Sequence, residues 1–81
     1  MNNERNERRT RQMNDYRQAR RMCAYIMPEN CNFFMFSQFH ITLMCWYTGR
    51  DNEKRLQHME MAQYYNKKME ENNERYRTNW Y

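Results

Sequence analysis

Residues 31–47, CNFFMFSQFHITLMCWY, decide the fold, because they are the one stretch that is mostly apolar and free of formal charge. Between Arg21 and Arg50 the only charged residue is Glu29. Apolar residues occupy every side of a helical wheel drawn through this stretch, and a helix that is apolar all round is buried in protein or in lipid. We therefore expect a central buried helix between two charged arms.

The same stretch has a second interpretation as a β-strand, because its residues alternate as the two faces of a strand do. One face would hold Phe39, Ile41, Leu43 and Cys45, and the other His40, Thr42 and Met44. A lone strand would lack a partner, because the sequence shows neither a hairpin signal nor a second convincing strand. The helix is therefore favoured for this segment.

Two local signals divide the chain. Pro28 has no backbone N–H and clashes with the preceding turn, so a helix ends or kinks there, or a new one begins. Thr48-Gly49 holds the only glycine, the residue type favoured just after a helix, and Asp51 can cap the helix that follows. We predict an all-α fold with helices near 4–27, 29–47 and 51–78. The corresponding segments are an Arg-rich arm at 1–27, an apolar segment at 28–48 and an amphipathic helix at 49–81.

The aliphatic content is too small for a substantial core. The 81 residues include no Val, and the only Leu and Ile residues are Ile26, Ile41, Leu43 and Leu56, whereas Met contributes 9 residues and Tyr 7. A chain this short is marginally stable alone, and Met specifies a unique packing less sharply than branched residues do. We expect no compact three-helix core and infer that the chain takes its final shape against a partner or a membrane. An independently folded small domain is the alternative.

The net charge of +4 lies at the N-terminal end, where residues 1–21 carry seven Arg against Glu4, Glu7 and Asp15. Clustered cations suit phosphate or anionic lipid, although such an arm can also simply be solvated. Interleaved Asn and Gln, with Tyr16 and Tyr25 nearby, favour RNA as the alternative partner, since arginine-rich segments fold on binding it. The basic patch comprises Arg5, Arg8, Arg9, Arg11, Arg17, Arg20 and Arg21.

The central segment is predicted to span a membrane. Its seventeen residues would cover about 25 Å as a helix, and extension back to Tyr25 supplies the rest of the roughly 30 Å hydrocarbon core. Aromatic residues stand at both ends, with Arg just outside. Polar residues inside the segment need hydrogen-bonding partners in lipid, so we expect them to face another subunit. A buried helix of a soluble scaffold protein and an artificial sequence are the other interpretations.

The C-terminal helix has a Met- and Tyr-rich seam at three-to-four spacing, with Lys and Glu on the other face. Because the seam contains Met and Tyr rather than Leu heptads, docking on a partner fits better than an autonomous coiled coil. The candidate partner-interface residues in the central and C-terminal helices are Ser37, Gln38, His40, Met61, Tyr65, Met69 and Tyr76.

No catalytic, cofactor or metal site is predicted. The three Cys show no C-x-x-C spacing, so we expect reduced thiols rather than a disulfide framework or a zinc site. Cys31 and Cys45 lie nine and five residues from His40, spacings that do not place either pair reliably on one helix face. We expect His40 to be hydrogen-bonded to a neighbour and His58 to be a surface residue of the third helix. The interpretation is of a chain that is not an enzyme.

The layout resembles that of single-span accessory subunits of mitochondrial respiratory complexes, such as the cytochrome c oxidase subunit VIc family. The matching features are the Arg-rich N-terminal helix, one apolar segment, and the charged helix EKRLQHMEMAQYYNKKMEENNERY at 53–76. The resemblance implies a non-catalytic subunit that stabilises its neighbours in the mitochondrial inner membrane, with protein subunits and lipid as partners. The positive-inside bias would place residues 1–21 in the matrix. The polar residues of the apolar segment and its lack of Ala, Val and Gly depart from the family's pattern, and no functional residue is carried over.

Overall fold

Helices make up nearly all of the computed structural model, which describes residues 3–79, with side chains as far as residue 75. The predicted all-α fold is confirmed, and the described residues contain no strand, so the alternative of a strand near Phe39 is wrong. The elements in chain order are α1 (Asn3–Met22), the 3₁₀ turns η1 (Cys23–Tyr25) and η2 (Pro28–Asn30), α2 (Cys31–Tyr47) and α3 (Asn52–Asn79).

Both predicted breaks are confirmed, and each has a local cause, but the first helix ends at Met22 and not near residue 27, because Cys23–Tyr25 forms a 3₁₀ turn. Met27 is extended, with φ −58° and ψ 134°, as the residue before a proline prefers, and Pro28 then starts η2, where no N–H is required. Gly49 has φ +79°, a left-handed conformation that residues with a Cβ seldom adopt. The Asp51 carboxylate accepts a hydrogen bond from the Lys54 backbone N–H at 3.1 Å, which caps α3.

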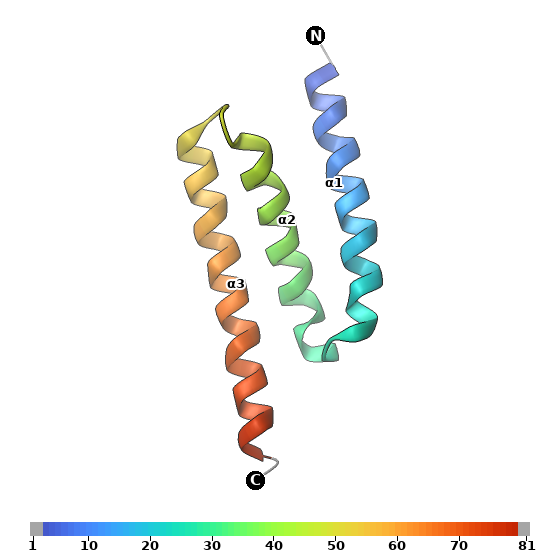
Figure 1. Ribbon diagram of the computed structural model, residues 1–81, viewed down its shortest axis with the longest axis vertical. Helices are drawn as coiled ribbons and strands as arrows, with labels where there is room; N and C mark the ends of the chain where they lie inside the picture. The colour runs from blue at the N-terminus through green and yellow to red at the C-terminus, as the bar shows by residue number, and fades with distance from the viewer. Residues whose placement is uncertain (1–2, 80–81) are drawn as a thin grey trace.

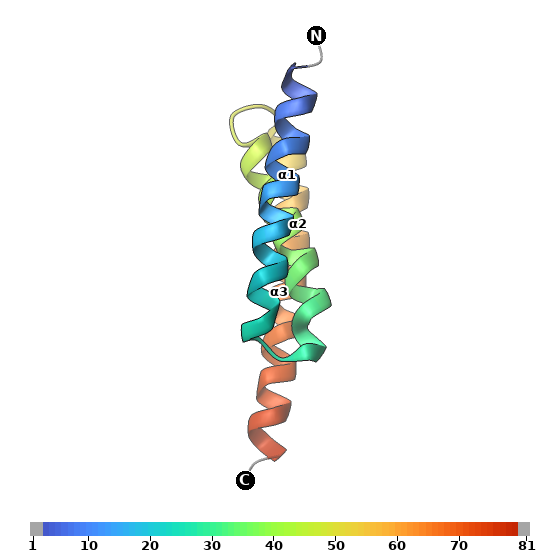
Figure 2. The same ribbon diagram turned by 90° about the vertical axis from the view of Figure 1, so that its right-hand side faces the viewer.

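The three helices form one layer, with α2 in the middle. Figure 1 shows α1 and α3 on opposite sides of α2, and Figure 2 shows the layer edge-on, with α1 at its edge. The principal extents are 57 × 26 × 13 Å, so the layer is about as thick as a single helix. Both broad faces of α2 are therefore left without a covering element from the described chain.

The buried apolar residues are few and come from all three helices: Ala19, Leu43, Trp46 and Ala62. Polar side chains are buried among them, and they form hydrogen bonds across the helices. Ser37 is fully buried and donates to Asn66 at 2.7 Å, and Thr42 donates to Asp15 at 2.8 Å. Ser37 and Thr42 of α2 therefore find within this chain the hydrogen-bonding partners that we had expected from another subunit.

Asn30 ties the α1–α2 turn to the far part of α3. Its side chain is buried, donates to Asn73 at 3.0 Å and accepts from Asn72 at 2.9 Å. A buried amide is stable only when its donors and acceptors are paired, so these two bonds fix the register of α3 against the start of α2.

Cys23 and Cys31 form a disulfide across the turn between α1 and α2, with their Cα atoms 5.4 Å apart. The expectation that all three thiols are reduced is therefore wrong for this pair. The chain reverses direction at Pro28, which brings together two residues whose eight-residue separation resembles no recognised motif. Cys45 is a free, exposed thiol.

The central segment was the predicted membrane span. Within the part of the chain that the structure describes, no helix has the combination of length and apolar character that crossing a membrane requires.

Candidate functional site

Eight aromatic and imidazole rings form a continuous cluster along the contact between α2 and α3. Tyr65 lies at its centre, with ring centroids 5.2 Å from Phe36, 6.3 Å from Phe33 and 5.9 Å from His40. We define the aromatic cluster as Phe33, Phe36, Phe39, His40, Tyr47, His58, Tyr64 and Tyr65, each of which contacts at least one other member. Offset and edge-to-face ring pairs of this kind add about 0.5–1.5 kcal/mol each beyond the area they bury.

A histidine pair joins the two helices inside this cluster. Nδ1 of His40 lies 2.9 Å from Nδ1 of His58, so one imidazole donates a hydrogen bond and the other accepts it. His40 stacks on Tyr65 and His58 stacks on Tyr47, at interplanar angles of 12° and 4°. The expected neighbour of His40 is thus His58, and the prediction that His58 is only a surface residue is wrong.

Burial lowers the pKa of His40 below its usual value, and the neighbouring His58 lowers it further. Burial also lowers the pKa of His58, with a second contribution from the Lys54 ammonium. If both rings were protonated, two N–H donors would face each other across the short Nδ1–Nδ1 distance. The folded chain therefore favours a pair that lacks at least one of the two protons.

Three rings of the aromatic cluster remain half exposed: Phe36 at 51 %, Phe39 at 49 % and Tyr64 at 52 %. Phe36 and Phe39 lie on α2, the helix with the highest apolar content, and α1 and α3 leave about half of each side chain uncovered. Large apolar side chains exposed together, rather than singly, mark an interaction surface. This exposed edge of the aromatic cluster is the candidate functional site.

The predicted interface residues of α2 are mostly occupied within the chain. Ser37 is covered and bonded to Asn66, and His40 is paired with His58. Gln38 is half-buried beside α1, where it lines a small groove. Of the side chains that we expected to face another subunit, Ser37 and His40 thus have their hydrogen-bonding groups engaged within this chain.

The predicted residues of α3 are placed differently. Met61 is 40 % exposed, whereas Tyr65 is half-buried at the centre of the aromatic cluster. Met69 is half-buried and lines a pocket with Met27 in the turn between α1 and α2. The side chain of Tyr76 lies outside the described residues. The structure therefore brings Tyr65 and His40 together and leaves Met61 available.

Phe36 and Phe39 were not selected by sequence reasoning, although at 100° per residue Phe36 falls on the same side of α2 as His40 and Tyr47. A helical wheel does not contain the position of α3. This helix partly covers Phe33 and leaves Phe36 and Phe39 exposed at the edge of the aromatic cluster.

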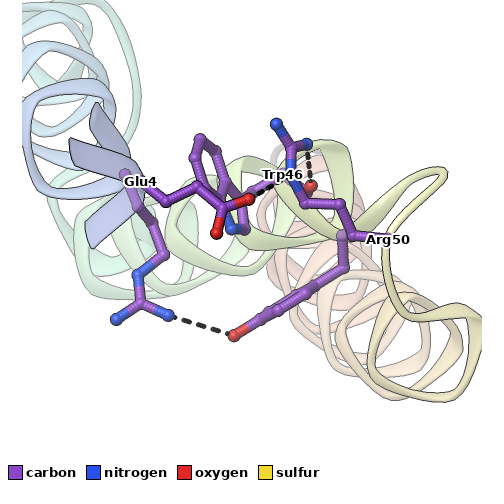
Figure 3. A network of polar contacts seen from close by, with 5 residues as sticks. Glu4, Trp46 and Arg50 are labelled. Atoms are coloured by element: carbon purple, nitrogen blue, oxygen red, sulfur yellow. Dashed lines mark hydrogen bonds and ion pairs between the residues drawn. The ribbon is translucent and has the colours of Figure 1, made fainter. Parts of the chain in front are cut away.

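A second cluster fastens α1 to the C-terminal end of α2 (Figure 3). The guanidinium of Arg50 stacks 4.0 Å from the centre of the buried Trp46 ring and donates to the Trp46 carbonyl oxygen at 2.5 Å. Glu4 on α1 approaches Arg50 at 3.7 Å, and Arg8 donates to the Tyr47 hydroxyl at 3.3 Å. The Glu4–Arg50 pair is well exposed, so it contributes little to stability, and the buried Trp46 is the apolar part of this cluster.

The predicted basic patch is divided between two sides of α1. Arg8 and Arg11 turn toward α2, where Arg8 bonds Tyr47 and Arg11 lies 5.9 Å from the centre of the Trp46 ring. The other members, Arg5, Arg9, Arg17, Arg20 and Arg21, are exposed.

Among the described side chains, no group of three or more His, Cys, Asp or Glu residues gathers in a way that could hold a metal ion. Comparisons with protein-family models, with curated proteins and with solved structures found no match to this chain. The function must therefore be argued from the geometry of the two clusters and from the distribution of charge.

Proposed function

We propose that the chain is a non-catalytic structural subunit of a larger assembly and that the exposed edge of the aromatic cluster is its contact with a protein partner. The observation that carries this proposal is the surface area. The chain exposes 6733 Å², whereas a compact monomer of its 10.5 kDa mass exposes about 5,400 Å². The excess of roughly 1,300 Å² is larger than the ~800 Å² that each partner contributes to a standard interface.

The side chains of the exposed edge and of the adjacent helix support a protein partner. Besides Phe36 and Phe39, Met61 of α3 is 40 % exposed, so apolar side chains are offered by two adjacent helices. Aromatic residues and Met are enriched at the centres of protein interfaces because they bury large areas at low entropic cost. A partner helix laid on this face would convert the single layer into a two-layer structure with a larger core.

The finer form of the proposal is the setting that the sequence layout favours, an accessory subunit of a mitochondrial inner-membrane complex. It rests on the resemblance in layout and on the apolar character of α2. Alkaline carbonate extraction tests it, because a membrane-inserted chain stays in the pellet and a peripheral one is released.

The interface is tested with the variant Phe36→Ser/Phe39→Ser. Velocity sedimentation of a native extract measures whether the epitope-tagged chain migrates with a larger assembly or near its own 10.5 kDa. We expect the parent chain to sediment with the assembly and the double variant to sediment as the free chain, because loss of central aromatic anchors typically costs 2 kcal/mol or more each.

The matched control is Met22→Ser/Tyr25→Ser, which removes two large exposed side chains, 47 % and 88 % exposed, outside the aromatic cluster. It should sediment like the parent. A double Phe variant that stays in the assembly, or a parent chain that sediments alone, would contradict the proposal.

A further inference from the structure

The charged residues of α1 lie on different faces of the helix, and the fold decides which of these faces stays open. At about 100° per residue, Arg5, Arg9, Arg17, Arg20 and Arg21 fall within an arc of about 160°. The same arc holds Asn3, Asn6, Thr10, Met13 and Tyr16, and all ten of these residues are exposed. We call this set the outer face of α1.

The carboxylates of α1 lie off this face. Glu4 approaches Arg50 and Asp15 accepts the hydrogen bond of Thr42, so both turn toward α2. Glu7 is exposed but lies outside the arc, beyond its Arg21 edge. The outer face therefore carries five positive charges and no negative one, although α1 as a whole contains both signs.

The position of α1 leaves this face open. The helix packs mainly against α2 and forms the edge of the layer, as Figure 2 shows. From Arg5 to Arg21 the helix rises about 24 Å, a length that faces about seven phosphates of one strand of B-form DNA. A straight helix with one continuous cationic side can thus follow a phosphate backbone.

We infer that the outer face of α1 binds the sugar-phosphate backbone of a nucleic acid. Every basic residue of this face is Arg, whereas α3 carries Lys54, Lys67 and Lys68. The planar guanidinium matches phosphate with two parallel hydrogen bonds, which a Lys ammonium cannot make. The amide groups of Asn3 and Asn6 add the uncharged donors that commonly accompany phosphate contacts.

An anionic membrane fits this face less well. A helix that lies in the lipid interface buries a broad apolar side, and here only Met13 and Tyr16 among the ten residues are apolar or aromatic. The arginines also flank these two residues instead of bordering an apolar stripe. The chemistry of the face is that of a polyanion contact along the helix.

The test uses two double variants that remove the same charge from the same helix. Arg9→Gln/Arg17→Gln alters the outer face, and Arg8→Gln/Arg11→Gln alters the side that faces α2. Fluorescence anisotropy measures binding of the full chain to a labelled RNA duplex, an RNA single strand and a DNA duplex between 50 and 200 mM salt. Flotation with phosphatidylserine vesicles forms the lipid arm, and circular dichroism checks that each variant keeps its helix content.

With five phosphate contacts, affinity for a duplex should fall about 500-fold between 50 and 200 mM salt, since each contact contributes about 0.9 to the logarithmic slope. Loss of two contacts should weaken binding about 60-fold at 100 mM salt for the outer variant. The inner variant should stay within about threefold of the parent. The relative affinities for RNA and DNA then identify which nucleic acid this backbone contact serves.

Three results would overturn the inference. The first is no binding to any nucleic acid at 50 mM salt. The second is equal loss in the outer and inner variants, which would mean that bulk charge and not a face of α1 is responsible. The third is binding to the vesicles without binding to nucleic acid. The outer face shares no residue with the aromatic cluster, so this inference and the proposed protein contact can fail separately.

Discussion

Breaking the Cys23–Cys31 disulfide should remove a large share of the stability of this chain. The bridge joins residues eight positions apart and closes a loop of about nine residues. In the chain-entropy model, releasing such a loop returns about 2.6 kcal/mol of conformational freedom to the unfolded state at 25 °C. The total free energy of unfolding expected for 81 residues is only about 4–12 kcal/mol.

The consequence should be concentrated at α1. This helix contributes Ala19 as its only buried residue among those described, and its packing contacts are mainly with α2. Once the turn is no longer closed, these contacts must by themselves offset the entropy of docking a 20-residue helix. We expect α1 to separate from α2 while the longer contact between α2 and α3 persists.

The measurement is urea unfolding of the Cys45→Ser chain, followed by circular dichroism with and without reductant. Cys45 is replaced because its exposed thiol could exchange with the bridge. For a slope of about 1 kcal/mol per M, reduction should lower the urea midpoint by about 2.5 M. Alkylation of the parent chain under denaturing conditions should label one thiol before reduction and three after it.

Either of two results would refute this reasoning. Labelling of all three thiols before reduction would show that the bridge does not form. A bridge that forms, but whose reduction moves the midpoint by less than about 0.5 M, would show that loop closure does not contribute to stability at this turn.

Two further predictions concern the packing on α2. Acidification should destabilise the fold through the His40–His58 pair, because both pKa values are lowered in the folded state. Below about pH 6.5 the unfolded chain therefore binds more protons than the folded chain. Stability that is present above about pH 6.5 is lost as the pH falls. Thermal unfolding at pH 7.5 and 5.5 should show a smaller pH dependence for His40→Gln/His58→Gln, and an unchanged dependence would exclude the pair as its source. Trp46→Ala should cost about 3–5 kcal/mol in urea unfolding, because this ring is only 5 % exposed beneath the Arg50 guanidinium. Phe39→Ala should cost about 1 kcal/mol, since that ring is 49 % exposed, and equal costs would contradict the assigned burial.

The candidate site was only half accessible to sequence reasoning. The helical spacing placed Phe36, His40 and Tyr47 on one side of the central helix, and it placed Tyr65 on the seam of the third. It did not indicate that His58 would contact His40, because that pairing depends on the register of α3 against α2. The register is fixed by contacts such as those of Asn30 with Asn72 and Asn73, which lie more than forty residues away.

The polar residues of the central helix illustrate the same limit. From their number we inferred that these side chains need hydrogen-bonding partners, and they do, because unpaired polar groups are costly to bury. The packing of the helices decides which groups become these partners. Ser37 and Thr42 bond to Asn66 and Asp15 of the two flanking helices, so both side chains are paired within the chain.

By itself the sequence determined the three helices and the two breaks between them, although not that the first helix ends as early as Met22. Pro28, Gly49 and Asp51 act on the backbone within a few residues of themselves, through a missing N–H, a permitted positive φ and a side-chain cap. Only the tertiary structure decided the Cys23–Cys31 disulfide, the histidine pair and the division of the arginines of α1 into an inner and an outer side. These features depend on the direction in which the chain returns after each turn and on the rotation of each helix against its neighbour. Both are set by packing between residues far apart in the sequence, which no local pattern encodes.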